Sequence, residues 1–234
     1  DRLILSIVFR LRVEGNQKII CVGMNYQEKR NEFNETCDAP TLFIRFPDTL
    51  SGHACPLIKP TNTNEFDYEG ELAVVIGKPA MNVSAKNALS YVAGYSCFMD
   101  GSVRDMQYSW FTSGKNWLNT GGFGPWMVTS DEIDDPQNLS IQTYLNGQQV
   151  QNDTTANMIR SVPELIAYIS AFSPLSPGDV IITGSPGGVG KKRTPPLFMK
   201  NGDLVEVEIS GIGRLINPIV QRRPVNNEMA TSSF

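Results

Sequence analysis

Histidine is almost absent from this chain of 234 residues, in which His53 is the single example. An HExxH zinc site needs two histidines on one helix face, so zinc-protease chemistry is excluded. A serine–histidine–aspartate triad would have to use His53, and no GxSxG nucleophile elbow accompanies it. We therefore expect His53, in the loop-like stretch Ser-Gly-His-Ala, to be a surface or structural residue.

Cysteines are few and are not paired in the sequence. The four residues Cys21, Cys37, Cys55 and Cys97 form no CxxC motif, which argues against a zinc ribbon or a thioredoxin-type site. Four cysteines in a chain of this size favour free thiols in a reducing compartment. We expect a cytoplasmic protein, with a mitochondrial one as the alternative.

The chain also lacks an excess of positive charge and a long apolar run. Its net charge is -4 and its pI is about 5.1, so we expect no nucleic-acid partner. No run of 18 apolar residues occurs, so we expect no membrane span. Residues 3–11 are mostly apolar, but Arg10 and Arg12 stand where a signal peptide would have a small-residue cleavage site, which indicates a strand.

Short strand patterns dominate what is present. The Asn146-Gly147 pair predicts a hairpin with a type I′ turn, because both residues accept positive φ angles. With no internal repeat and no low-complexity linker, we expect one domain, residues 1–234. The predicted strands are residues 18–22, 71–76, 91–99, 179–183 and 204–209.

Helices are few. The clearest begins at Ser161, where Glu164 completes a capping box and Pro163 fits the first turn. Shorter helices are predicted in residues 27–33, 84–91 and 101–110. The sum is a β-rich α+β fold with a few short helices, not a doubly wound nucleotide-binding fold.

Three acidic residues form the first candidate site. Glu69 and Glu71 are two apart at the entrance to an apolar strand, so their side chains share a face. Two carboxylates this close repel unless a cation lies between them, and oxygen ligands suit Mg²⁺, Mn²⁺ or Ca²⁺. Asp100 closes another apolar strand and is a candidate third ligand. The alternatives are a solvated acidic strand end for the pair and a helix N-cap for Asp100.

A cluster of cationic and amide groups follows. Arg104, Gln107 and Lys115 lie within a dozen residues of one another and could bind a substrate carboxylate or a developing enolate. The alternative is an ordinary polar surface helix.

A glycine-rich loop follows the predicted strand 179–183. It fails the phosphate-loop pattern, because Ser185 stands in place of the first glycine and Lys192 in place of Ser or Thr. A tight turn, or close approach of the backbone to a small ligand, explains this loop better.

Taken together, these motifs resemble the fumarylacetoacetate hydrolase family over residues 18–220, and this span is the expected core of the domain. The resemblance lies in several separated motifs that occur in the family's order. They are ICVGMNY (20–26), DYEGELAVVIG (67–77), VAGY (92–95), DGSVRD (100–105), GKN (114–116), PGDVIITG (177–184) and NGD (201–203).

The resemblance implies a mixed β-roll, paired as a homodimer, that acts on a small 1,2- or 1,3-dicarbonyl acid. It implies Mg²⁺ or Mn²⁺ on Glu69, Glu71 and Asp100. It implies substrate contacts from Arg104, Gln107, Lys115 and Thr183.

The chain departs from the family pattern after Asn25-Tyr26. Hydrolytic members often have a His and a Glu there that activate water, and these positions hold Lys29 and Glu32. An exposed ammonium keeps its proton at neutral pH, so Lys29 is a poor base for hydrolysis, and the two residues could simply form a helical ion pair. Leu118 also stands where many members have Asp.

We therefore predict a metal-dependent hydrolase or lyase that forms an enolate, with Lys115 and Gln107 as donors to the enolate oxygen and Lys29 and Glu32 as catalytic candidates. Decarboxylation of an oxaloacetate-like acid and hydrolysis of an acylpyruvate are about equally expected, with enol–keto tautomerisation behind them. The competing hypothesis is a repurposed member that only binds its ligand.

Overall fold

The computed structural model describes residues 17–36, 38–108 and 110–221, and strands make up most of its regular structure. The strands are β1 (Ile19–Gly23), β2 (Thr41–Arg45), β3 (Leu50–Gly52), β4 (Leu57–Lys59), β5 (Phe66–Asp67), β6 (Gly70–Ile76), β7 (Val92–Asp100), β8 (Ser102–Val103), β9 (Gly121–Thr129), β10 (Ser140–Leu145), β11 (Gln148–Thr154), β12 (Val180–Ile182), β13 (Leu204–Ile209) and β14 (Gly213–Gln221).

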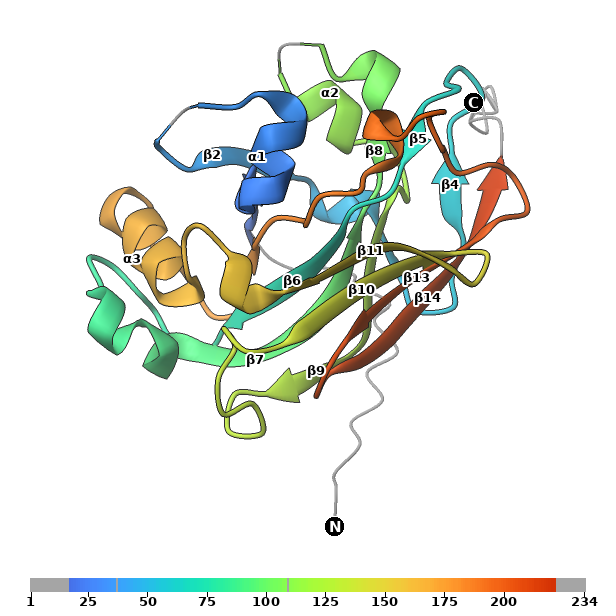
Figure 1. The fold of residues 1–234 in the computed structure, drawn as a ribbon. Helices are drawn as coiled ribbons and strands as arrows, with labels where there is room; N and C mark the ends of the chain where they lie inside the picture. Colours follow the sequence, from blue (N-terminus) through green and yellow to red (C-terminus); the bar gives the residue numbers. More distant parts are fainter. Residues whose placement is uncertain (1–16, 37, 109, 222–234) are drawn as a thin grey trace, which may run out of the picture.

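The strands form two large mixed sheets and a small two-stranded one. The first sheet has the order β2-β1-β12-β6-β7-β9-β3, and the second has the order β11-β10-β13-β14-β4. Strands β6 and β7 are antiparallel neighbours near the centre of the first sheet, and both pack against strand β13 of the second. Figure 1 shows the two sheets curling around each other. The centre of the molecule is therefore the β6–β7 pair.

Alternation along β6 explains how this strand joins two layers. Leu72 and Val74 face the main core between the sheets, while Ala73 belongs to a smaller apolar cluster with Phe98 and Phe123. Successive side chains of a strand point to opposite faces, so a continuous apolar run is what a strand covered on both faces requires.

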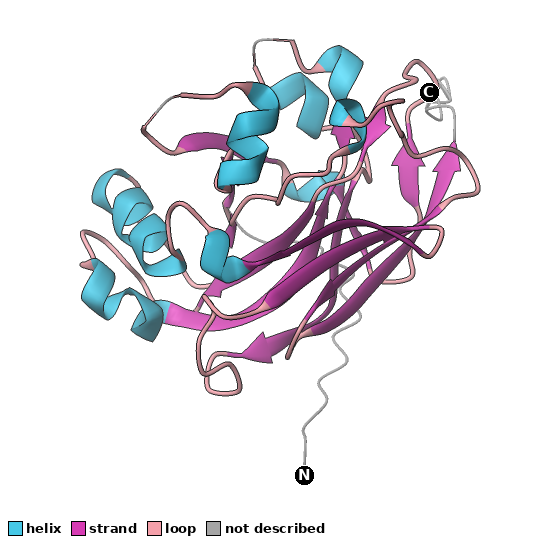
Figure 2. Cartoon of the chain, viewed as in Figure 1, coloured by secondary structure: helices cyan, strands magenta, loops and turns pink. Residues whose placement is uncertain are grey.

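The helices lie around the sheets (Figure 2). Helices α1 and α2 lie at one end of the sheets, near β5 and β8, and α3 lies at the side with η2. The α-helices are α1 (Gln27–Phe33), α2 (Thr112–Lys115) and α3 (Val162–Phe172). The 3₁₀ turns are η1 (Pro47–Thr49), η2 (Ala85–Tyr91), η3 (Arg104–Met106), η4 (Thr155–Asn157) and η5 (Gly190–Lys192).

The predicted fold class, a β-rich α+β fold with few helices, is confirmed. The capping box of α3 is present in full, with Ser161 accepting from the Glu164 N–H and the Glu164 side chain accepting from the Ser161 N–H. Asn146 and Gly147 have φ angles of 53° and 78°, which confirms the predicted turn.

Two helix predictions need correction. The helix predicted over residues 101–110 is wrong, because residues 102–103 form strand β8 and only Arg104–Met106 form a 3₁₀ turn. Residues 84–91 form a 3₁₀ run rather than an α-helix. The strand predicted in residues 3–11 lies outside the described residues.

Candidate metal centre and adjoining pocket

Three carboxylates converge at the end of the central strands. Glu69 precedes β6, Glu71 lies on it, and Asp100 ends β7, with the Asp100 N–H donating to the Glu69 carbonyl at 2.8 Å. One oxygen of each carboxylate lies within 4.8 Å of the others, and all three side chains are buried. The structure thus brings together the three residues expected as ligands.

Glu69 is surrounded by cations. Lys29 Nζ and Arg104 Nη2 each donate to its Oε1 at 2.7 Å, and Lys115 and the Ser102 hydroxyl donate to its Oε2. Burial alone would raise the pKa of Glu69, but Arg104, Lys115 and Lys29 outweigh it and hold that pKa well below the usual value. Glu69 is therefore a carboxylate that stays charged.

Asp100 is also compensated by cations. Arg45 Nη1 donates to its Oδ1 at 2.5 Å, and Lys115 Nζ donates to its Oδ2 at 2.6 Å. Burial opposes the charge of Lys115, but Asp100 and Glu69 raise its pKa above the usual value. Lys115 is therefore a fixed positive charge between two of the three carboxylates.

Glu71 differs from the other two. Its Oε2 accepts from the Gly184 N–H at 2.7 Å, and it forms no ion pair among the described residues. Burial, Asp100 and Glu69 raise its pKa well above the usual value. A divalent cation against Glu71 would supply the missing compensation, and three carboxylates are the oxygen ligands that Mg²⁺ and Mn²⁺ prefer. The residue set therefore fits such a cation.

Lys29 lies inside the site. The residue is 3% exposed, and its Nζ donates to Ser185 Oγ at 3.1 Å as well as to Glu69. Burial lowers its pKa, although Glu69 partly offsets this. Two assumptions made from the sequence are therefore wrong, because Lys29 is not exposed and its partner is Glu69 rather than Glu32.

Glu32 holds α1 to the glycine-rich loop. Its Oε1 accepts from the Gly188 N–H at 2.7 Å, while its Oε2 is buried without a hydrogen-bond partner. Neither of the two pockets described below is lined by Glu32, and its catalytic role stays a prediction.

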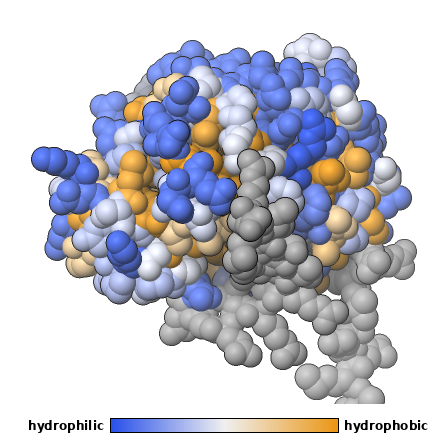
Figure 3. Space-filling view, turned by 90° about the horizontal axis from the view of Figure 1, so that it is seen from below, coloured by the Kyte–Doolittle hydropathy of each residue, from blue (hydrophilic) through white to orange (hydrophobic). Residues whose placement is uncertain are grey.

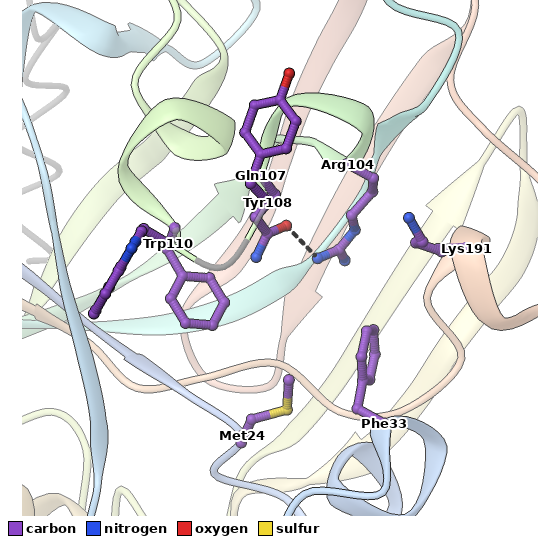
Figure 4. Close-up of a pocket in the computed structure, with 8 residues that line it drawn as sticks. Met24, Phe33, Arg104, Gln107, Tyr108, Trp110 and Lys191 are labelled. Atoms are coloured by element: carbon purple, nitrogen blue, oxygen red, sulfur yellow. Dashed lines mark hydrogen bonds between the residues drawn. The ribbon is translucent and has the colours of Figure 1, made fainter.

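Two connected pockets lead from the surface to the carboxylates. The inner pocket, of about 20 Å³, is lined by Gly23, Met24, Lys29, Phe43, Glu69, Glu71, Arg104, Phe111, Lys115 and Ser185. The outer pocket, of about 230 Å³, is lined by Met24, Phe33, Arg104, Gln107, Tyr108, Trp110, Phe111 and Lys191. The two pockets share Met24, Arg104 and Phe111, so the outer pocket adjoins the space next to the carboxylates. Figure 4 shows the outer pocket, with Met24 and Arg104 among its lining residues.

Arg104 stands between the two pockets. Its Nε donates to Asp67 Oδ2 at 2.9 Å and its Nη1 donates to Gln107 Oε1 at 3.2 Å. A guanidinium can only donate, so the oxygen of Gln107 must face it and the amide nitrogen is left to donate to a ligand. Figure 4 shows this nitrogen on the side away from Arg104.

Thr183 lies beside the site rather than in a pocket. The Thr183 hydroxyl donates to the Leu72 carbonyl at 3.0 Å. The side-chain amide of Asn25 donates to the Thr183 carbonyl at 2.9 Å. Ser185, two residues further on, lines the inner pocket. The predicted substrate contact of Thr183 therefore stays a prediction, and Ser185 is the hydroxyl nearest to the carboxylates in that loop.

Asp67 binds the backbone at the end of the glycine-rich loop. Its carboxylate accepts from the N–H groups of Gly190 and Lys191 at 2.8 and 3.1 Å. A Cβ on Gly190 would lie 1.8 Å from the Leu197 carbonyl oxygen and 2.6 Å from Asp67 Oδ1. Glycine is thus required at position 190 for close packing against another backbone segment, and this packing places η5 at the rim of the outer pocket.

Sequence reasoning missed Arg45, Asp67 and Ser185. Arg45 is fully buried at the end of β2, and a cation at the end of an apolar strand was the available signal. Asp67 carried a similar signal, since it immediately precedes the Glu69 motif. His53, as expected, is structural, since its Nδ1 accepts from the Ile216 N–H at 3.2 Å.

Two packed β-sheets, with three buried carboxylates at the ends of β6 and β7 in the first sheet, define a β-rich domain with an acidic centre suited to a hard cation. The family model described as fumarylacetoacetate (FAA) hydrolase C-terminal matches residues 18–220. The chain belongs to the fumarylacetoacetate hydrolase family.

Similar proteins include several named as enzymes. A fumarylacetoacetate hydrolase domain-containing protein 2 homolog of Dictyostelium discoideum is 43% identical over 86% of this chain and 71% of that protein. The mitochondrial oxaloacetate tautomerase of Xenopus laevis is 42% identical over 89% of this chain and 67% of its own length. The crystal structure of a 2-hydroxyhepta-2,4-diene-1,7-dioate isomerase from Mycobacterium marinum has a TM-score of 0.77 and 37% identity, covering 88% of this chain and 75% of that one.

Two further findings concern the cysteines and the length of the helices. Cys21, Cys55 and Cys97 are free cysteines in the described part of the chain. Within the same residues, no helix is long and apolar enough to cross a membrane.

Proposed function

We propose that this chain is a divalent-metal-dependent tautomerase that interconverts the enol and keto forms of a small dicarbonyl acid of the oxaloacetate type. The observation that carries the proposal is a cluster of three buried carboxylates with two buried lysines against it, of which Lys115 is paired with Glu69 and Asp100 and Lys29 with Glu69 alone. When the surroundings shift the pKa values of two groups at one site apart, one group suits proton transfer and the other suits charge stabilisation. Tautomerisation needs these two roles and no activated water.

The metal would be held by Glu69, Glu71 and Asp100. When bound, Mg²⁺ or Mn²⁺ supplies Lewis-acid polarisation of the α-keto oxygen. Lys115, which stays protonated, donates to the oxygen on which enolate charge develops, and the Gln107 amide donates to the substrate carboxylate in the outer pocket.

Lys29 is the proposed proton carrier. Its pKa is lowered by burial, so its neutral amine is more accessible than that of an exposed lysine. In the keto-to-enol direction the amine would remove a proton from the substrate carbon next to the keto group, and the resulting ammonium would give that proton to the enolate oxygen. In the reverse direction the amine would take the proton from the enol oxygen and the ammonium would deliver it to the carbon. Ser185 and Glu69 hold the Lys29 nitrogen at the inner pocket.

Decarboxylation is the second candidate, because loss of CO₂ from a β-keto acid produces the same enolate in the same pocket. Hydrolysis of an acylpyruvate has less support, since Glu32, the residue expected to activate water, is bound to the glycine-rich loop. Tautomerisation, which ranked behind the other two reactions from the sequence, thus becomes the first candidate. Similarity to a protein named oxaloacetate tautomerase supports this change.

The test follows enol-oxaloacetate by its ultraviolet absorbance and pyruvate by a coupled assay, with enzyme loaded with Mg²⁺ or Mn²⁺. We expect metal-dependent loss of the enol band without matching release of pyruvate. Pyruvate release at the rate of enol loss would instead establish a decarboxylase, and no effect of metal on either rate would exclude the proposal.

Assembly and location are further proposals. We propose a homodimer, and sedimentation at several concentrations tests it. The exposed apolar side chains near β2 and α2 that a partner could cover include Ile44, Phe46 and Leu118. The face seen in Figure 3 mixes hydrophilic and hydrophobic residues and gives no competing continuous patch on the atoms it colours. The similarity to mitochondrial relatives favours that compartment over the cytoplasm.

A further inference from the structure

One aromatic ring at the outer pocket is surrounded by cations from three different segments. The Lys192 ammonium lies 4.4 Å from the centre of the Phe33 ring, the Lys29 ammonium 5.4 Å and the Arg104 guanidinium 5.8 Å. Such distances lie within the range of cation–π attraction. Three cations therefore lie close to the Phe33 wall of the outer pocket.

Two of these three charges are already neutralised. Lys29 is paired with Glu69, and Arg104 is paired with both Glu69 and Asp67. These pairs are buried and short, so these two cations contribute little free charge to the outer pocket.

The two lysines of η5 differ from them. Lys191 lines the outer pocket and is paired at 3.0 Å with Glu65, but both side chains are more than a third exposed, so this pair is weak. Lys192 is exposed and forms no ion pair among the described residues. Two lysines against one glutamate leave an excess of one positive charge at the rim.

The position of η5 is fixed rather than accidental. Asp67 accepts from the Lys191 N–H, and Gly190 packs against the Leu197 carbonyl, so the backbone that carries both lysines is anchored next to Arg104. Figure 4 shows Lys191 on the same side of the pocket as Arg104 and Phe33. Arg104 lines both pockets, and Lys191 and Phe33 line the outer one, so the outer pocket joins the surroundings of the carboxylates to η5.

We propose that Lys191 and Lys192 form a subsite for a second carboxylate, at the end of the substrate away from the metal, so that the site selects dicarboxylic over monocarboxylic keto acids. The inference rests on the proposed function and names the substrate class. One excess charge matches one carboxylate, whereas a phosphate monoester carries close to two negative charges at neutral pH. Both lysines act on specificity and take no part in proton transfer.

The experiment compares two ligands of equal chain length, 2-oxoglutarate and 2-oxopentanoate. They share the α-keto acid head, only the first has a distal carboxylate, and neither is a β-keto acid that loses CO₂ readily. Calorimetry on enzyme loaded with Mg²⁺ measures their affinities. We expect the diacid to bind about three- to tenfold more tightly, as one partly exposed charge pair predicts, and this ratio to shrink with added salt.

The test variant is Lys191→Ala/Lys192→Ala, in which both acids should bind with equal affinity. Its matched control is Lys78→Ala/Lys86→Ala, which removes the same charge from two exposed lysines outside both pockets and should keep the ratio. The single variant Lys192→Gln should also lower the ratio of diacid to monoacid affinity. It replaces the double variant in the test if the double variant does not fold.

A ratio near one in the unmodified protein, or a ratio that survives in the double variant, overturns the subsite and leaves the proposed function standing. Failure of both acids to bind in the presence of Mg²⁺ is a different result, and it overturns the proposed function together with the subsite.

Discussion

Three carboxylates in one site have different electrostatic surroundings. Glu69 and Asp100 have lysine or arginine partners, while the one hydrogen-bond partner of Glu71 in the described part of the chain is the Gly184 N–H. Removal of Glu71 should therefore weaken metal binding without breaking an ion pair. The next two predictions use this difference, and a third concerns Lys29.

Glu71→Gln should abolish tight binding of Mg²⁺ and Mn²⁺ while the protein stays folded, because the amide keeps the shape of the side chain but loses the ligand charge. Titration calorimetry measures the loss, and Glu132→Gln, an exposed residue outside the cluster, is the control. Unchanged affinity in Glu71→Gln would remove Glu71 from the ligand set.

The same variant should change the pH dependence of stability in metal-free buffer. The folded state raises the pKa of Glu71 above its usual value of 4.5, so it keeps a proton that the unfolded chain loses. The free energy of unfolding should then fall as pH rises above about 4.5, and this loss should be smaller in Glu71→Gln. Urea unfolding from pH 5 to pH 8 with a chelator measures both proteins, and parallel curves would contradict the prediction.

Lys29→Met and Lys29→Arg should both lower kcat for tautomerisation by about 10²–10⁴-fold, the usual effect of losing a general acid–base group. Arginine keeps the positive charge beside Glu69 but does not give up its proton. Recovery of activity in Lys29→Arg would therefore show that Lys29 serves only as a charge.

The sequence revealed the carboxylates but not all of their partners. Glu69 and Glu71 are two residues apart, and strand periodicity alone places them side by side. The hydrogen bonds from Lys29 to Glu69 and from Arg45 to Asp100 join residues 40 and 55 positions apart, and no local pattern encodes such pairs.

At the scale of the elements, the predictions succeeded where the local sequence pattern was strong. Strand β13 alternates apolar and acidic residues, and α3 has a complete capping box, so both were predicted from sequence. Strand β9 begins with glycines and contains Pro125, residues that read as a turn. Its pairing with β7 and β3 in the sheet overrides that weak propensity.

Ser161→Ala should lower the free energy of unfolding by about 1 kcal/mol, the usual cost of an N-cap hydroxyl. The loss follows from its bond to the Glu164 N–H. Chemical denaturation measures the change, and Ser173→Ala at the other end of α3 should cost less because no side-chain bond caps that end. Equal losses in the two variants would contradict this.

Gly190→Ala should displace η5 and lower stability more than Gly23→Ala. A Cβ on Gly190 would collide with backbone oxygen, whereas a Cβ on Gly23 would meet the Thr41 methyl group at an ordinary 3.4 Å. Thermal unfolding of both variants is the measurement. Equal melting temperatures would show that the loop around η5 adapts at little cost.

The whole molecule combines strands that the sequence predicts with sheet partners that it does not. Strand β12 lies between β1 and β6, although it is more than 100 residues away from β6 in the chain. Such pairings depend on packing across the complete core. Local patterns therefore predict the strands and the fold class, but not the order of the strands in the sheets.

Binding of a metal should stabilise the whole domain, because the ligands exist as a set only when β6 and β7 are paired. At a free concentration 100 times Kd, the gain is about 2.7 kcal/mol. Thermal unfolding with Mg²⁺, Mn²⁺ or a chelator should show a higher Tm with metal, and Glu71→Gln should show no such increase. A metal-induced rise of equal size in that variant would place the cation elsewhere.

The pairing of β6 with β7 has a consequence for the order in which the chain assembles. These strands are close in sequence, so a folding chain can bring Glu69, Glu71 and Asp100 together before Arg45 and Lys29 arrive from more distant segments. During that interval Arg104 and Lys115 are the nearby cations, and Glu71 has no ion-pair partner among the described residues. A divalent ion present at that moment would act as a folding aid as well as a reagent, and the nascent site would acquire its ion before its pocket has closed.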